Sequence, residues 1–142
     1  MVATRLVLLA LVALGLLSGC GYFRRVGECR RLAARVNGNL DEIAAAHDAG
    51  GATEATYRDL ADRYDRLARD VDGFARGDAP LDKTLKEYAQ AFQETARSLR
   101  ALSDAIEKQD PLAAGRLRRD INNFARRDRT LVTRLDALCA EP

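Results

Sequence analysis

From Val26 onward, the apolar residues of the chain recur at alternating spacings of three and four. This spacing is the period of one face of an α-helix, and no segment shows the two-residue alternation of a half-buried strand. We therefore expect an all-α fold built from four helices. Their seam residues are Cys29, Leu32, Val36, Leu40, Ile43 and His47; Tyr57, Leu60, Tyr64, Leu67, Val71 and Phe74; Leu81, Leu85, Tyr88, Phe92, Thr95, Leu99, Leu102 and Ile106; and Ala114, Leu117, Ile121, Phe124, Asp128, Leu131, Leu135 and Leu138.

Turn and capping residues separate the four predicted helices. The pair Gly50-Gly51 ends the first helix, and Thr53 is a favourable N-cap for the second, which we expect to end at Arg76-Gly77. The third helix follows Asp78, and Asp110-Pro111 places a capping side chain and a first-turn proline at the start of the fourth. Each boundary therefore has its own local signal.

Gly38 lies inside the first predicted helix. A glycine there costs about 1 kcal/mol relative to alanine, but the apolar seam continues across it. We expect one continuous helix, and a kink at Gly38 is the alternative.

The connections between the predicted helices are short, so neighbouring helices should run antiparallel. The expected architecture is an antiparallel up-down-up-down four-helix bundle over residues 26–142. A spectrin-like or extended coiled-coil arrangement is the alternative, but a two-residue connection such as Gln109-Asp110 favours a compact hairpin.

The first 19 residues have the layout of an export signal. A single charge at Arg5 precedes an apolar run from Leu6 to Leu17, which is followed by small residues. The run has about 12 residues, whereas a helix needs about 20 to span a bilayer. We therefore expect residues 1–19 to be removed rather than to form a transmembrane helix.

The tetrapeptide Leu17-Ser18-Gly19-Cys20 resembles the lipobox of bacterial lipoproteins. This resemblance implies cleavage before Cys20, a diacylglycerol on its thiol and a further acyl chain on its new amino group. Several acyl chains together give stable membrane anchoring. Gly21, in place of an aspartate, favours the outer membrane facing the periplasm, with residues 20–25 as a short tether. The alternative is a plain secretory signal in which Cys20 is an incidental thiol.

Cys29 and Cys139 lie near the start of the first helix and the end of the fourth, which meet at one end of an up-down-up-down bundle. An exported protein enters an oxidising compartment, so we expect a disulfide between them. Closing a loop of roughly 110 residues stabilises a fold by about 4 to 5 kcal/mol in the chain-entropy model. An intermolecular bridge and a redox pair are the alternatives.

Composition and charge exclude several classes of protein. The 142 residues include 23 basic and 21 acidic side chains, for a net charge of +2. A chain of this length is no large enzyme, and this charge balance does not indicate nucleic acid as the main partner. The 47% hydrophobic content also excludes intrinsic disorder.

The residue types for metal or haem chemistry are scarce. His47 is the only histidine and Met1 the only methionine. Paired Glu-x-x-His motifs, zinc sites and haem ligation therefore lack ligands. His47 lies at a helix end, where its imidazole is explained by a favourable interaction with the helix dipole. Asp128 interrupts the fourth seam, and we expect it to pair with an arginine of a neighbouring helix or to be locally solvated. The alternative for Asp128 is a polar position inside a ligand cavity. We expect no cofactor, no metal and no catalysis.

Five arginines gather near the expected anchor. A cluster of basic residues next to a bilayer gains about 1 kcal/mol per residue from anionic headgroups, so these side chains could hold the domain against the membrane. The alternative is an ordinary solvated face. The residues are Arg24, Arg25, Arg30, Arg31 and Arg35.

These observations favour a lipid-anchored envelope protein with a structural or protein-interaction role. The alternative is a helical bundle that binds a small molecule or a lipid in an aromatic-lined cavity. A cavity of at least about 300 Å³ would favour ligand binding, whereas a dry core with an exposed apolar stripe would favour protein interaction. The aromatic residues expected at such a cavity are Tyr57, Tyr64, Tyr88, Phe74, Phe92 and Phe124.

Overall fold

The structure, a computed structural model, describes the backbone of residues 2–74, 77 and 79–140. Side chains are described for residues 26–74, 77, 79–124, 127 and 130–140. The expectation of an all-α fold is confirmed, because this part of the chain contains helices and no strand. The helices are α1 (Val2–Gly50), α2 (Glu54–Asp72), α3 (Ala79–Glu107) and α4 (Pro111–Ala140).

Three predicted helix boundaries are confirmed by their local geometry. α1 ends at Gly50, and Gly51 has φ +64°, a left-handed conformation that glycine adopts without steric cost. Oγ1 of Thr53 accepts a hydrogen bond from the backbone N–H of Thr56 at 3.2 Å, as an N-cap does. Oδ1 of Asp110 accepts one from the N–H of Ala113 at 2.9 Å, at the start of α4.

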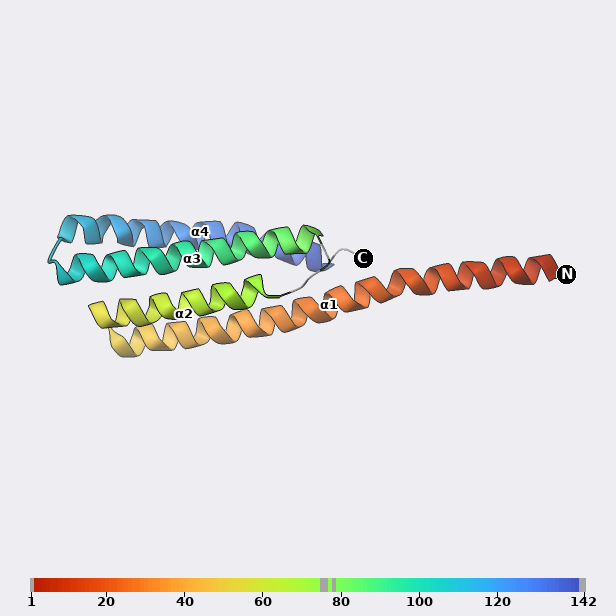
Figure 1. The fold of residues 1–142 in the computed structure, drawn as a ribbon, viewed down its shortest axis with the longest axis horizontal. Coiled ribbons are helices and arrows are strands. Elements are labelled where there is room, and N and C mark those ends of the chain that lie inside the picture. The colour runs from red at the N-terminus through yellow and green to blue at the C-terminus, as the bar shows by residue number, and fades with distance from the viewer. Residues whose placement is uncertain (1, 75–76, 78, 141–142) are drawn as a thin grey trace.

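α1 begins earlier than predicted, at Val2 rather than Val26. Glycine lowers helix propensity but, unlike proline, keeps its backbone N–H donor, so Gly19, Gly21 and Gly27 do not interrupt the helix. The predicted continuity through Gly38 is confirmed. Consequently the expected signal, the expected tether and the first helix of the domain lie on one helix, whose N-terminal half projects beyond the other three helices (Figure 1).

α2 ends earlier than predicted, at Asp72 rather than at Arg76-Gly77. The backbone N–H of Gly73 bonds to the carbonyl of Arg69 at 3.0 Å, and that of Phe74 bonds to Val71 at 3.1 Å, which tightens the last turn. Phe74 therefore lies in the connection after the helix, where its half-buried ring still packs against the core.

Successive helices run in opposite directions in Figure 1. Among the four helix pairs in contact, α2 and α3 share the most extensive contact, followed by α3 with α4 and α1 with α2, and α1 with α4 share the smallest. The core lies mainly between α2 and α3. Its most completely buried large side chains are Phe92, Leu67, Leu81, Leu85, Leu102 and Val71.

Ion pairs join the helices that share wide contacts. Arg100 of α3 binds Asp62 and Asp65 of α2 at 2.7 and 2.5 Å, and hydrogen bonds to both carboxylates raise the pKa of its guanidinium. Arg127 of α4 binds Glu94 of α3 at 2.7 Å. Two further pairs, Arg35 with Asp70 and Arg63 with Glu42, join α1 to α2. Between α1 and α4, no ion pair joins two side chains that are both described.

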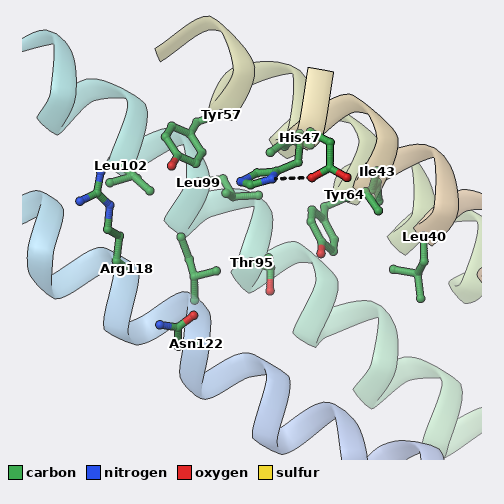
Figure 2. Close-up of a pocket in the computed structure, with 14 residues that line it drawn as sticks. Leu40, Ile43, His47, Tyr57, Tyr64, Thr95, Leu99, Leu102, Arg118 and Asn122 are labelled. Atoms are coloured by element: carbon green, nitrogen blue, oxygen red, sulfur yellow. Dashed lines mark ion pairs between the residues drawn. The ribbon is translucent and has the colours of Figure 1, made fainter. Parts of the chain in front are cut away.

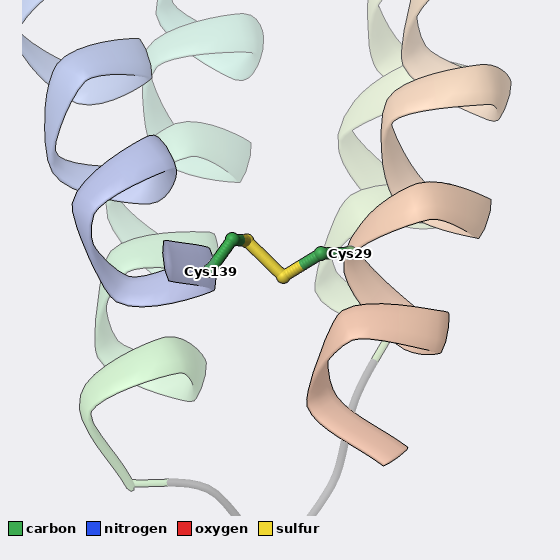
Figure 3. The surroundings of a disulfide bond; sticks show 2 residues. All are labelled: Cys29 and Cys139. Atoms are coloured by element: carbon green, nitrogen blue, oxygen red, sulfur yellow. A yellow bond between two sulfur atoms is a disulfide. The ribbon is translucent and has the colours of Figure 1, made fainter. Parts of the chain in front are cut away.

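The link between α1 and α4 is instead covalent. The sulfur atoms of Cys29 and Cys139 lie 1.98 Å apart and their Cα atoms 6.1 Å apart, which is a disulfide pair (Figure 3). The expected pairing is thus present in the structure. Apart from this bond, α1 and α4 share only a small contact.

Candidate functional site

A cavity of about 520 Å³ lies between the helices on the side where α1 and α4 separate, and all four helices contribute to its lining (Figure 2). On each helix the lining residues are mostly three or four positions apart, because residues at that spacing share one face of the helix. The lining comprises Leu40, Ile43, Ala44, His47 and Asp48 from α1; Tyr57, Leu60 and Tyr64 from α2; Thr95, Leu99 and Leu102 from α3; and Arg118, Ile121 and Asn122 from α4.

The interior of the cavity is apolar. Leu60 is 3% exposed and Leu102 1% exposed, so both belong to the core as well as to the cavity wall. The ring of Tyr64 lies 6.0 Å from that of Phe92 and 6.4 Å from that of Phe124, measured between centroids. Since this aromatic cluster backs the wall with packed side chains, the cavity has a preformed surface.

The polar side chains lie at the rim. Nδ1 of His47 is 3.6 Å from Oδ1 of Asp48, and Arg118 and Asn122 are exposed on the opposite helix. Arg118 forms no ion pair with any residue whose side chain is described. The rim therefore contains the His47–Asp48 contact and an arginine that has no ion-pair partner among the described side chains.

Three hydroxyl-bearing residues line the cavity, Tyr57, Tyr64 and Thr95, and the hydroxyls of Thr95 and Tyr57 differ in their hydrogen bonding. Thr95 donates its hydroxyl proton to the carbonyl of Ala91 at 3.1 Å. Tyr57 is a largely buried residue, yet its hydroxyl makes no hydrogen bond within the described part of the chain. A ligand in the cavity can therefore bond to the Tyr57 hydroxyl without displacing a protein partner.

The structure divides the six aromatic residues expected at a cavity. Tyr57 and Tyr64 line this one. Tyr88, Phe92 and Phe124 stack on one another in the core instead, with ring centroids 4.9 Å apart for Tyr88 and Phe92 and 5.9 Å apart for Phe92 and Phe124. Phe74 packs from the connection after α2, away from this lining. Aromatic rings bury more area against each other than at an open wall, so the remaining lining is mostly aliphatic.

Arg118 and Asn122 were not anticipated as site residues. Each follows an apolar seam residue of α4 directly, after Leu117 and Ile121. A position beside the seam is polar in most amphipathic helices, so the sequence carried only a weak signal: two polar residues four apart along one edge of the seam.

His47 lies in the last turn of α1, as expected for a residue near the helix dipole, and its imidazole is about half exposed. The structure additionally places it on the cavity rim, opposite Arg118 and Asn122 (Figure 2).

The expected membrane-proximal arginines have different environments. Arg30 and Arg31 are exposed, whereas Nε of Arg35 is 3.2 Å from Oδ2 of Asp70 and so ties α1 to α2. The side chains of Cys20, Arg24, Arg25 and Asp128 lie outside the described residues, as does every contact expected of them.

The described residues contain neither a metal-binding cluster nor a membrane-spanning helix. No three side chains among His, Cys, Asp and Glu come together as a metal site there. Within that same part of the chain, no helix combines the length and apolar character needed to cross a bilayer.

The cavity combines an apolar wall with a polar rim. Comparisons with known protein families, with curated proteins and with solved structures give no match to this chain.

Proposed function

We propose that this chain is a lipid-anchored cell-envelope four-helix bundle that binds a small, mainly apolar molecule between its helices. The observation that carries the proposal is the cavity of about 520 Å³. Sites for small molecules occupy about 300 to 1,000 Å³ and combine apolar walls with a few polar groups. The cavity has both properties.

An up-down-up-down bundle is supported by three features. Successive helices are antiparallel. The connection between α3 and α4 is closed tightly by Gln109, at φ 54°, and by a 2.9 Å hydrogen bond from the N–H of Asp110 to the carbonyl of Ala105. The disulfide brings α4 back to α1. Such a bundle offers ligand space between facing helices.

Anchoring through Cys20 is supported by the lipobox resemblance and is compatible with the geometry of α1. The helix is continuous from Cys20 to His47, a span of roughly 40 Å at a rise of 1.5 Å per residue. An anchored domain would therefore hold its cavity well away from the bilayer surface, in contact with the aqueous compartment.

The sequence pattern ranked a structural or protein-interaction role first, and the cavity changes that order. An interaction surface should expose a contiguous apolar stripe. Among the described side chains, the large hydrophobic residues that are exposed are Leu112 and Val132, which lie 20 positions apart on α4. Such isolated residues do not form a stripe, whereas the cavity exceeds the threshold for ligand binding.

Native mass spectrometry of the full-length protein, extracted gently from its own membranes, tests ligand binding. We expect a bound small-molecule mass on the wild type. Ala44→Trp should remove it, because Ala44 is an exposed residue at the cavity wall where an indole would occupy the space. Ala45→Trp is the matched control, since Ala45 is equally exposed but does not line the cavity.

Two results would contradict the proposal. One is a bare protein mass for the wild type, which would leave a structural role or a transient protein partner. The other is a ligand mass that persists unchanged in Ala44→Trp, which would place the ligand elsewhere.

The anchoring component has its own test. Cells fed an alkyne-labelled fatty acid should incorporate the label into the wild-type chain and lose it in Cys20→Ser. Cys29→Ser should retain the label, because its thiol is assigned to the disulfide. Persistent labelling of Cys20→Ser, or an unlabelled wild type, would refute the anchor.

A further inference from the structure

We infer that the ligand is an amphiphile with an aliphatic chain and one carboxylate head, and that Arg118 binds the head. This inference rests on the proposed ligand-binding function and goes further by naming the chemical class. It follows from the charge of the rim, from the donors around it and from the position of Arg118 along the cavity.

Arg118 differs from the arginines that join the helices in having no ion-pair partner among the described side chains. Arg58, Arg100 and Arg127 each bind a carboxylate of a neighbouring helix within 2.7 Å. Arg118 faces the cavity and has no such partner among the described side chains. The one acidic residue of the lining, Asp48, lies beside His47 at 3.6 Å. An anionic ligand would therefore supply an ion-pair partner for Arg118.

Two further polar groups of the lining can act as hydrogen-bond donors. The Tyr57 hydroxyl makes no hydrogen bond with described residues, and the Asn122 side chain is exposed on the same helix as Arg118. A carboxylate accepts several hydrogen bonds at once, and those from a guanidinium are stronger than neutral ones. These donors match a carboxylate better than an ammonium group, which would meet the like charge of Arg118.

Arg118 lies toward one end of the cavity. In Figure 2, Arg118, Tyr57 and Leu102 lie toward one side of the cavity, while Leu40, Ile43 and Tyr64 lie toward the other. The side with Arg118 is the end of the bundle near the α3–α4 connection. An extended ligand would thus place its head there and its tail toward the disulfide end.

Exposure of the rim makes this orientation favourable. A lone carboxylate buried among leucines would lose its hydration at high cost. Arg118 and Asn122 are exposed, so a head group at their position keeps part of its water while the chain covers the interior. The aliphatic walls for that chain are Leu40, Ile43, Leu60, Leu99, Leu102 and Ile121.

The test compares decanoate, decanol and decylamine, which share one aliphatic chain. Binding is measured by titration calorimetry on the full lipidated protein in phosphatidylcholine nanodiscs, after subtraction of empty nanodiscs. We expect decanoate to bind about tenfold more tightly than decanol, and decylamine to bind more weakly than both.

Two variants assign the effect to Arg118. Arg118→Gln should weaken decanoate binding about tenfold and leave decanol binding unchanged. Arg116→Gln is the matched control: it removes an equally exposed arginine of α4 that has no ion pair with described residues and does not line the cavity. Wild-type affinity for decanoate is expected there.

The outcomes separate this inference from the proposed function. Equal affinities for decanoate and decanol, with no effect of Arg118→Gln, would overturn the carboxylate assignment. If Ala44→Trp still abolished that binding, the cavity function would stand. Absence of binding by all three amphiphiles, with a bare native mass, would overturn both.

Discussion

Phe92 is the residue around which the interior is organised. Its side chain is 1% exposed, and the rings of Tyr88, Phe124 and Tyr64 surround it at centroid distances of 4.9, 5.9 and 6.0 Å. Because these rings come from α2, α3 and α4, one side chain connects three helices. Tyr64 also lines the cavity, so the same packing supports the site.

Phe92→Ala should therefore lower the free energy of unfolding by about 3 to 5 kcal/mol, through lost burial and a cavity that the neighbouring rings cannot fill. Urea denaturation followed by circular dichroism measures the change. Leu112→Ala is the control, since Leu112 is 81% exposed and its loss should cost less than about 0.5 kcal/mol. Similar losses for the two variants would show that the aromatic cluster is not the stabilising centre.

At the scale of the helices, two glycines of α1 have opposite environments. A Cβ atom added to Gly38 meets no other atom within 4 Å. A Cβ atom added to Gly50 would lie 2.5 Å from Oγ1 and 2.9 Å from Cγ2 of Thr56. Thr56 cannot easily move away, because its hydroxyl donates to the Gly50 carbonyl at 2.8 Å and lies 2.7 Å from that of Thr53.

The two alanine variants should consequently differ in sign. Gly38→Ala should stabilise the protein by about 0.5 to 1 kcal/mol, because alanine favours the helix interior. Gly50→Ala should destabilise it by about 1 to 3 kcal/mol, because the α1–α2 connection must shift. Thermal unfolding of both variants provides the measurement, and a stabilising Gly50→Ala would contradict the close approach of Thr56.

The helix ends differ in whether the local sequence predicts them. The caps at Thr53 and Asp110 follow from the hydrogen-bonding capacity of their own side chains, which the sequence reveals directly. The sequence does not reveal that α2 ends at Asp72, because the apolar spacing continues to Phe74. Phe74 keeps its contact with the core from a non-helical position, and periodicity alone cannot distinguish the two conformations.

At the scale of the whole molecule, the Cys29–Cys139 disulfide joins α1 and α4, which have the smallest contact among the helix pairs that touch. The double variant Cys29→Ser/Cys139→Ser should lose about 4 to 5 kcal/mol of stability in the chain-entropy model, since the unfolded chain gains the freedom of a long open loop. Chemical denaturation with and without a reductant measures this loss.

The wild type under reducing conditions serves as the control and should unfold as the double variant does. A reductant that leaves the wild-type transition unchanged, together with a double variant of full stability, would contradict the role of the disulfide in joining α1 to α4.

The sequence by itself determined the helical content, three of the helix boundaries and the pair of cysteines that could meet. These properties depend on local rules, namely the spacing of apolar residues, the capping side chains and the order of elements along the chain. The seam of α3 illustrates this, because Leu81, Leu85 and Phe92 are all buried as the spacing predicts.

Only the tertiary structure decided which seam residues face the cavity and which face the core. Tyr64 and Phe92 occupy equivalent seam positions in sequence, yet Tyr64 reaches the cavity and Phe92 does not. Arg118 and Asn122 enter the site because α4 separates from α1 beyond the disulfide. That separation depends on how four helices pack at once, which the periodicity of any single helix cannot encode.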